Sequence, residues 1–144
     1  MAYEIERLSN LGDLVNYLND VDTDFGIPLS NKVSIDSFAE KLIKHGIVLV
    51  IRNNDEIISC IGFYCNDIIE RFAYLPILST KKSARGKGFA RLLILQMLKE
   101  CKAKKMRAVF CDSINSHAIS LYKSIGFIEY KREGEKSFLE YRIE

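Results

Sequence analysis

The stretch "STKKSARGKGFARLLILQ", Ser79–Gln96, decides the fold. In it Gly86 and Gly88 flank a lysine, and an apolar run with helical spacing starts directly after them. A helix that opens on such a turn has first N–H groups without intrahelical partners, and these groups attract anions. We therefore expect an anion-binding turn here. The alternative is an ordinary strand-to-helix turn with solubilising charges.

Two known phosphate-binding motifs do not fit this turn. A P-loop needs G-x-x-x-x-G-K-[ST], but Lys87 is followed by Gly88 and not by a hydroxyl residue. A dinucleotide fingerprint needs a third glycine three residues after Gly88, where Arg91 stands. The turn can still bind an anion although it matches neither motif, because its glycines allow an anion to approach the backbone.

The rest of the chain predicts a mixed α/β sheet. Leu11, Leu14, Val15 and Leu18 have the spacing of an amphipathic helix, and Ser34 can cap a second helix that Gly46 ends. The expected order is β-α-α-β-β-β-α-β-α-β-β. The expected strands are 3–8, 47–51, 57–65, 71–80, 108–111, 127–131 and 138–143, and the later helices are 88–104 and 115–125. Pro76 cannot donate to a strand ladder, so it marks an edge, a bulge or an opening in the sheet.

Length and composition bound the class of protein. A chain of 144 residues with 48% hydrophobic and 28% charged residues suits one globular domain, residues 1–144. No apolar run approaches the ~20 residues of a spanning helix, and the start lacks a signal peptide, so we expect a cytoplasmic protein without membrane partners.

Charge and cysteine usage narrow the class further. Residues 1–72 carry 6 basic and 12 acidic side chains, whereas residues 73–144 carry 15 and 7. The basic half suits an anionic ligand, and no nucleic-acid-binding motif accompanies it. The spacing of the four cysteines and two histidines gives no metal site, and we expect four reduced, mostly buried thiols.

Two motifs stand out, "RGKGFA" at 85–90 and "NSHAISLYKSIGF" from Asn115 to Phe127. Together they resemble those of the GNAT superfamily of N-acetyltransferases. The family pattern [QR]-x-x-G-x-[GA] is matched by "RGKGFA" at 85–90. The pattern N-x-x-A-x-x-L-Y-x-x-x-G-F is matched completely from Asn115 to Phe127. The resemblance implies a mainly antiparallel sheet flanked by helices. It also implies acetyl-coenzyme A as acyl donor and an amine of a small molecule, an amino sugar or a peptide as acceptor.

The resemblance also implies which residues bind the donor. In the family the backbone of the glycine turn holds a pyrophosphate, the strand before it pairs with the pantetheine arm, and the asparagine contacts that arm. As an N-cap, Asn115 serves equally well without such a contact. The implied cofactor-binding residues are Leu78, Ser79, Thr80, Arg85, Gly86, Lys87, Gly88, Phe89, Ala90 and Asn115.

Tyr122 resembles the general acid of the family. A phenol with a reference pKa of about 10 can protonate a leaving thiolate, whose reference value is about 8.5, at little cost. The base is left open between Glu70, near the start of the preceding strand, and a water held by a hydroxyl such as that of Ser79. Both Glu70 and His117 also suit plain solvent exposure.

The resemblance also implies an acceptor side between the first two helices and the last hairpin. Asp20, Asp22 and Asp24 there would attract a cationic amine, or would belong to a solvated turn. A different class of function is a catalytically silent module that binds acyl-coenzyme A. The resemblance leaves a monomer or a homodimer open.

Overall fold

A computed structural model describes residues 3–144. Its elements are β1 (Ile5–Arg7), α1 (Leu11–Val21), α2 (Ile35–His45), β2 (Ile47–Asn53), β3 (Glu56–Tyr64), β4 (Phe72–Thr80), α3 (Phe89–Ala103), β5 (Ala108–Ser113), α4 (Ser116–Ile125), β6 (Ile128–Glu133) and β7 (Lys136–Arg142). Three short 3₁₀ turns lie at Asp22–Asp24, Leu29–Asn31 and Lys82–Ala84. The order of helices and strands is the predicted one.

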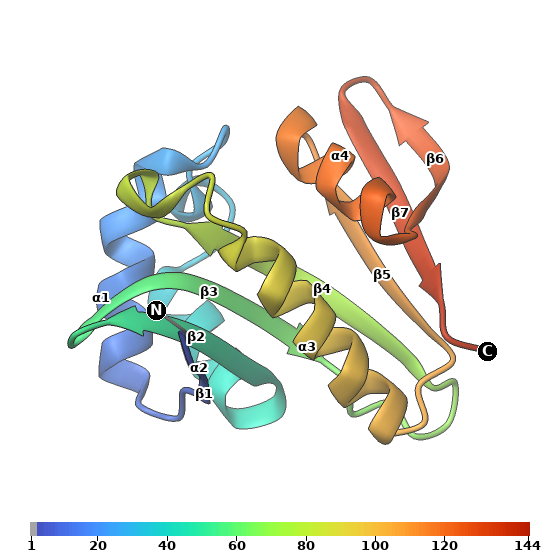
Figure 1. Ribbon diagram of the computed structural model, residues 1–144, viewed down its shortest axis with the longest axis horizontal. Helices are drawn as coiled ribbons and strands as arrows, with labels where there is room; N and C mark the ends of the chain where they lie inside the picture. The colour runs from blue at the N-terminus through green and yellow to red at the C-terminus, as the bar shows by residue number, and fades with distance from the viewer. Residues whose placement is uncertain (1–2) are drawn as a thin grey trace.

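The seven strands form one sheet in the order β1-β2-β3-β4-β5-β7-β6. Every neighbouring pair is antiparallel except β4 and β5, which run parallel. Figure 1 shows these two strands side by side at one end and apart at the other. The mixed, mainly antiparallel α/β fold is therefore confirmed.

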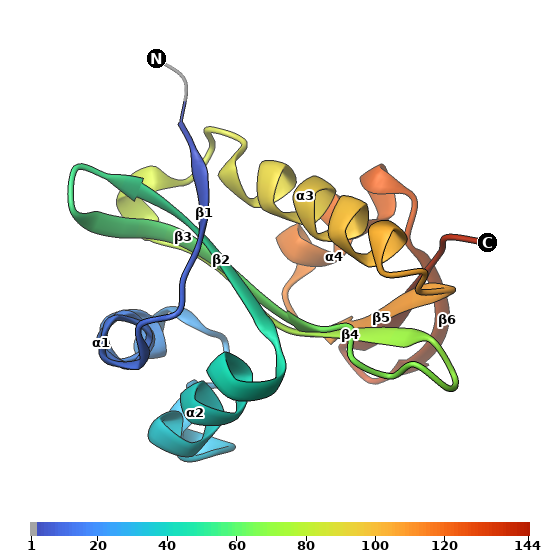
Figure 2. The ribbon, with the colours of Figure 1, turned by 90° about the horizontal axis from the view of Figure 1, so that it is seen from below.

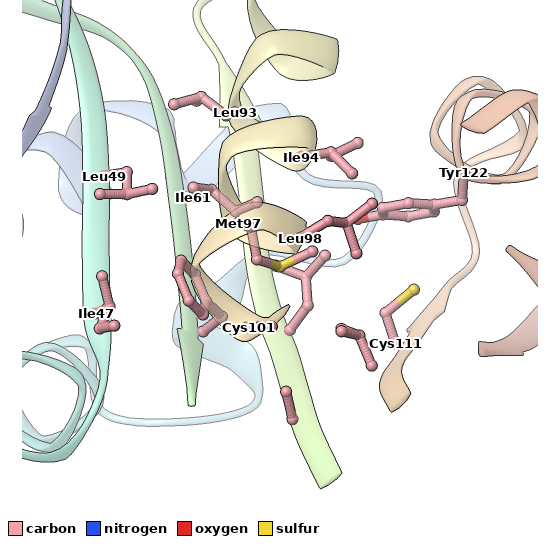
Figure 3. Close-up of a cluster of buried hydrophobic side chains, with 14 of the residues drawn as sticks. Ile47, Leu49, Ile61, Leu93, Ile94, Met97, Leu98, Cys101, Cys111 and Tyr122 are labelled. Atoms are coloured by element: carbon pink, nitrogen blue, oxygen red, sulfur yellow. The ribbon is translucent and has the colours of Figure 1, made fainter. Parts of the chain in front are cut away.

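Helices cover both faces of the β1–β4 part of the sheet. In Figure 2, α1 and α2 lie on one face and α3 and α4 on the other. Each face has its own apolar core: the one under α3 includes Leu93 and Met97, and the one under α1 and α2 includes Leu18 and Leu42. Figure 3 shows the side chains of α3 that point onto the sheet. Burial of such stripes stabilises the fold by roughly 25 cal/mol per Å² of apolar area.

The two cores also explain the cysteines. Cys60 belongs to the core under α1 and α2, and Cys65 belongs to the core under α3, so the two thiols lie on opposite faces. All four cysteines are free and buried, as predicted.

Local sequence explains where the helices begin and end. The Ser34 hydroxyl accepts a hydrogen bond of 3.3 Å from the Ser37 amide and caps α2, as predicted. Gly126 stops α4 with φ of +127°, a conformation that L residues rarely adopt. Gly62 on β3 is required for packing and not for a helix end, because a Cβ there would overlap Cδ2 of Leu42. The missing side chain lets α2 approach the sheet.

The structure differs from the sequence prediction at the last hairpin. The segment 132–136 was expected to be a loop, but β6 continues to Glu133 and β7 starts at Lys136. Gly134, with φ of +60°, supplies the left-handed conformation that a tight turn needs. The reversal therefore takes two residues, where the sequence suggested five.

Among the described residues, no helix is long and apolar enough to cross a membrane.

Candidate active site

The N-terminal end of α3 has the geometry of an anion site. Gly86 and Gly88 have φ of +80° and +84°, and a Cβ added at either would meet no atom within 4 Å. Gly88 is the N-cap residue and has no side chain that could cap the first amides. The amides at this end are left to an external acceptor, and the open space above both glycines gives that acceptor access. This arrangement fits a phosphate group.

The basic residues around this turn differ in what they contact. Lys81 lies 2.8 Å from a Glu56 oxygen, and Lys82 lies 3.5 Å from an Asp24 oxygen. The Arg85 Nε donates to the Thr80 carbonyl at 3.1 Å, which fixes the turn to the end of β4. An Arg91 Nη2 donates to the Ser124 hydroxyl at 2.8 Å and links α3 to α4. Two of these cations, Lys81 and Lys82, are thus already paired with carboxylates.

The gap beside this turn starts where β4 and β5 separate. Only three register pairs join them, from Phe72 opposite Ala108 to Tyr74 opposite Phe110. Toward Thr80, no strand of the described residues 3–144 pairs with the edge of β4 on that side. Pro76 lies just past the last pair, so the predicted opening of the sheet is confirmed.

A bulge in β4 lies at the same point. Gly62 pairs with Ile77 but Tyr64 pairs with Tyr74, so β4 has one more residue than β3 between these pairs. Because of the extra residue, the odd-numbered side chains point to one face of the sheet before the bulge and to the other face after it. Leu75 faces the core under α3, and Ile77, two residues later, faces the core under α1 and α2.

Tyr122 reaches this gap from α4. Its side chain is 4% exposed and extends from α4 toward α3 (Figure 3). Burial raises the pKa of Tyr122 well above its ordinary value, and the nearby Cys111, Asp112 and Tyr74 raise this pKa further. The hydroxyl therefore stays protonated across the neutral range. The sequence-based assumption of an ordinary phenol is wrong, because this group is a weaker acid than a free tyrosine.

Asn115 and Ser79 both make structural hydrogen bonds. The Asn115 Oδ1 accepts from the amides of His117 and Ala118 at 2.9 and 3.0 Å, which makes Asn115 the N-cap of α4. Its side-chain NH₂ group is not used by the cap. The Ser79 hydroxyl is buried and lies 3.0 Å from the hydroxyl of Tyr17. Burial raises the pKa of Tyr17, so this pair is a neutral contact between α1 and β4.

One cavity of about 1690 Å³ joins the turn, the strand gap and Tyr122. This volume exceeds the usual range for one drug-sized ligand, about 300–1,000 Å³. Ten predicted site residues line it: Leu78, Ser79, Thr80, Arg85, Gly86, Gly88, Phe89, Ala90, Asn115 and Tyr122. Residues spread over 45 positions of the chain, from Leu78 to Tyr122, therefore meet around one space.

Two predicted site residues do not line this cavity, Lys87 and Glu70. Lys87 is exposed beside the turn, so it can serve an anion through its backbone amide. Glu70 lies in an exposed turn, where its amide donates to Asp67 Oδ1 at 3.0 Å. The next residue, Arg71, contacts Lys105 beyond the far end of α3. An α3 of 15 residues separates that end from the glycine turn by about 22 Å. This position argues against Glu70 as the base.

The sequence analysis missed several polar residues of the cavity, among them Tyr74 and Asp112. The Tyr74 hydroxyl donates to Asp112 Oδ2 at 3.3 Å. Burial, and next the Asp112 carboxylate, raise the pKa of Tyr74 to about 12. Asp112 stands three residues before Asn115, but only the parallel pairing of β4 and β5 brings it to Tyr74. Strand periodicity alone could not find that contact.

The acidic residues of the N-terminal loop divide between the two alternatives that the sequence left open. Asp22 accepts two hydrogen bonds from Ser30 and closes its own loop, which lowers the pKa of Asp22. Asp24 lines the cavity, but Asp20 and Asp22 do not. Among residues 3–144, no group of three or more histidine, cysteine or acidic side chains could hold a metal ion.

Comparisons with known proteins define the class and then the family. An acetyltransferase of the GNAT family from Streptococcus pneumoniae has a TM-score of 0.79 at 18% identity, over 99% of this chain and 100% of that one. The PaiA N-acetyltransferase from Thermoplasma acidophilum, in complex with coenzyme A, has a TM-score of 0.76 at 21% identity, over 99% of each chain. The NatC complex bound to Gag peptide and coenzyme A has a TM-score of 0.78 at 19% identity, over 100% of each chain.

These likenesses show the fold of an acetyltransferase. A family model described as "Acetyltransferase (GNAT) domain" matches residues 27–142. The chain belongs to this family of GNAT acetyltransferases. No curated protein sequence matches the chain. The family and the coenzyme A complex of a structural neighbour support acetyl-coenzyme A as the acyl donor.

Proposed function

We propose that the protein transfers an acetyl group from acetyl-coenzyme A to the primary amine of a small molecule, an amino sugar or a peptide. One observation carries this proposal: the left-handed glycine turn, the unpaired edge of β4 and the buried Tyr122 line one cavity. A phosphate site, a polar strand edge and a proton donor are the three features that a coenzyme A thioester requires of its enzyme.

The cavity offers a binding site for successive parts of the donor molecule. The first amides of α3 and the space above Gly86 and Gly88 suit the pyrophosphate. Leu78, Ser79 and Thr80 belong to the part of β4 whose outer edge has no strand partner, so its backbone is available to an amide-containing arm. The NH₂ group of Asn115 can donate to the same arm from the other side of the gap. When bound, the donor supplies an activated acyl thioester.

Tyr122 serves the leaving group in this proposal. During transfer a C–N bond forms and a C–S bond breaks, the amine nitrogen loses one proton, and the sulfur leaves as a thiolate that takes a proton from solvent. The raised pKa keeps the Tyr122 hydroxyl protonated, so it donates a hydrogen bond where negative charge grows on sulfur. A complete proton transfer is less favourable than an ordinary phenol would allow. We assign stabilisation of the developing thiolate as its main contribution.

Glu70 has no part in this proposal because of its distance from the cavity. The amine proton leaves toward the part of the cavity lined by Tyr74 and Asp112, which we call the acceptor half and where the Tyr74 hydroxyl donates to the Asp112 carboxylate. Peptide amines stay among the candidate acceptors because one structural neighbour is bound to a peptide. A single domain over residues 1–144, a cytoplasmic location and a monomer or homodimer complete the proposal.

A panel of amines with acetyl-coenzyme A tests the proposal, with release of free thiol as the readout. Thermal unfolding with acetyl-coenzyme A is measured in parallel. Ligand at ~100 times its Kd adds about 2.7 kcal/mol to the stability of the native state. Stabilisation together with thiol release supports the enzyme. Stabilisation without turnover of any amine would instead support the silent binding module. If millimolar donor gives neither stabilisation nor thiol release, the proposed function is wrong.

A further inference from the structure

A row of five side chains crosses the sheet along the acceptor half of the cavity. In spatial order these residues, the cross-sheet row, are Lys41 of α2, Tyr64 of β3, Tyr74 of β4, Asp112 of β5 and Lys136 of β7, and all five line the cavity. The Lys41 Nζ lies 5.7 Å from the centre of the Tyr64 ring. Tyr64 and Tyr74 are register partners on neighbouring strands.

The row continues through the parallel strand pair. The Tyr74 hydroxyl donates to Asp112 Oδ2 at 3.3 Å, and the Lys136 Nζ lies 3.5 Å from Asp112 Oδ1. Asp112 has its side chain about a quarter exposed, so it is neither enclosed nor fully solvated. The row thus has a single carboxylate beside the strand gap, two aromatic rings, and one lysine at each end.

The charges of the row do not suit an acceptor with two cationic groups. Asp112 is paired with Lys136, and the other acidic lining residue, Asp24, is paired with Lys82 at 3.5 Å. Within residues 3–144, Lys41 makes no ion pair, and its ammonium group lies over a tyrosine face. Lys41 is the group in the row that an anion would satisfy.

We propose that the acceptor is a primary amine that also carries a carboxylate several bonds away. Its amine binds Asp112 and the Tyr74 hydroxyl beside the strand gap, its hydrocarbon part lies on the rings of Tyr64 and Tyr74, and its carboxylate binds Lys41. The cross-sheet row suits an acceptor whose two charged groups lie several bonds apart, because β3 and β5 are two strand spacings apart, roughly 10 Å. This inference rests on the proposed function, whose acceptor it specifies.

Three amines of similar length test this charge pattern: 6-aminohexanoate, 1-aminohexane and 1,5-diaminopentane. The wild type should use 6-aminohexanoate with the highest kcat/KM of the three. Lys41→Gln should lower the ratio of kcat/KM for 6-aminohexanoate over 1-aminohexane about tenfold, through KM, because a charge-assisted hydrogen bond is lost. Lys41→Arg should restore most of the ratio.

A matched control lies on the same helix. Lys44 is exposed on α2 but does not line the cavity, so Lys44→Gln should leave the ratio unchanged. Preference of the wild type for the diamine, or an unchanged ratio in Lys41→Gln, would overturn the inference. A ratio that depends on Lys136→Gln and not on Lys41→Gln would also overturn it, because the carboxylate would then lie beside Asp112.

Calorimetry separates failure of this inference from failure of the proposed function. Binding of 6-aminohexanoate to the coenzyme A-loaded protein needs no turnover, and Lys41→Gln should raise its Kd about tenfold. If no amine reacts but this difference in Kd is found, the acceptor site stands and the transfer reaction fails. If amines react and neither Kd nor the ratio depends on Lys41, the transfer stands and the inference fails.

Discussion

The glycine turn allows a prediction with a close internal control. Gly88 and Gly134 both have positive φ, +84° and +60°, and at both a Cβ would meet no atom within 4 Å. Alanine at either position therefore adds a methyl group to open space and forces an L residue into the left-handed region. That conformation costs roughly 1–2 kcal/mol, offset in part by the lower entropy of the unfolded chain. We expect both variants to lose about 1 kcal/mol of stability, or about 3 °C in Tm.

The two variants should differ in their binding of coenzyme A. The methyl group of Gly88→Ala occupies the space where a phosphate would reach the first amides of α3, whereas Gly134 lies in the β6–β7 turn and does not line the cavity. Loss of one or two hydrogen bonds to a charged group costs about 1.5–3 kcal/mol, so Kd should rise roughly 10- to 150-fold. Gly134→Ala should keep the wild-type Kd.

Isothermal titration with coenzyme A measures both constants, and thermal unfolding of the free proteins measures both stabilities. Lys87→Ala is a second control, because the Lys87 side chain does not line the cavity. Its Kd should change less than about threefold. Equal Kd values for the Gly88→Ala and Gly134→Ala variants, at equal Tm, would refute the assignment of the phosphate to this turn.

Three further predictions follow from other parts of the structure. Tyr122→Phe keeps the buried ring, so Tm and the Kd of coenzyme A should hardly change, while kcat with a suitable amine should fall about 10²- to 10³-fold because one donor to the developing thiolate is lost; a wild-type kcat with chemistry rate-limiting would contradict the role of the hydroxyl. Gly62→Ala should lower the free energy of unfolding by about 1–3 kcal/mol in urea titration, because the new Cβ would overlap Leu42, and an unchanged midpoint would show that α2 can shift freely. Hydrogen bonds from Arg132, then Ser137, lower the pKa of Glu129 to about 2, so this carboxylate stabilises the native state fully above pH ~4.5 and loses that effect as pH falls toward 2. The difference in Tm between wild type and Glu129→Gln should therefore shrink over that range, and a constant difference would show that the pairing does not stabilise the fold.

Local signals in the sequence predicted most of the fold. The cap at Ser34, the stop at Gly126 and the glycine turn are set by residues within a few positions, and the structure has all three. Strand ends were harder, because a terminal strand residue depends on the neighbouring strand. At 132–136 polar composition suggested a loop, but cross-strand pairing extends both strands to a two-residue turn.

The candidate site was predictable where motifs define it and not where tertiary contacts do. Gly86, Gly88 and Tyr122 line the cavity because each follows directly from a helix boundary or a helix face. The position of Glu70 depends on the length and direction of a loop, which the residues around it do not encode. Asp112 and Tyr74 meet only across parallel strands that lie 38 residues apart in the chain. The raised pKa of Tyr122 depends on burial, which a motif does not contain.

The bulge in β4 has a consequence for how this strand can vary. Before it, odd-numbered residues such as Ala73 and Leu75 face α3; after it, the odd-numbered Ile77 faces α1 and α2. The side chains that face α3 therefore have odd numbers before Pro76 and even numbers after it. Deletion of one residue at this junction would remove the bulge and leave both halves on their present faces, because Leu75 and Ile77 would then alternate as ordinary strand neighbours. A deletion or insertion within either half would instead move the side chains beyond it to the opposite face. We therefore expect the strand to tolerate a change in length at Pro76 better than at any other position.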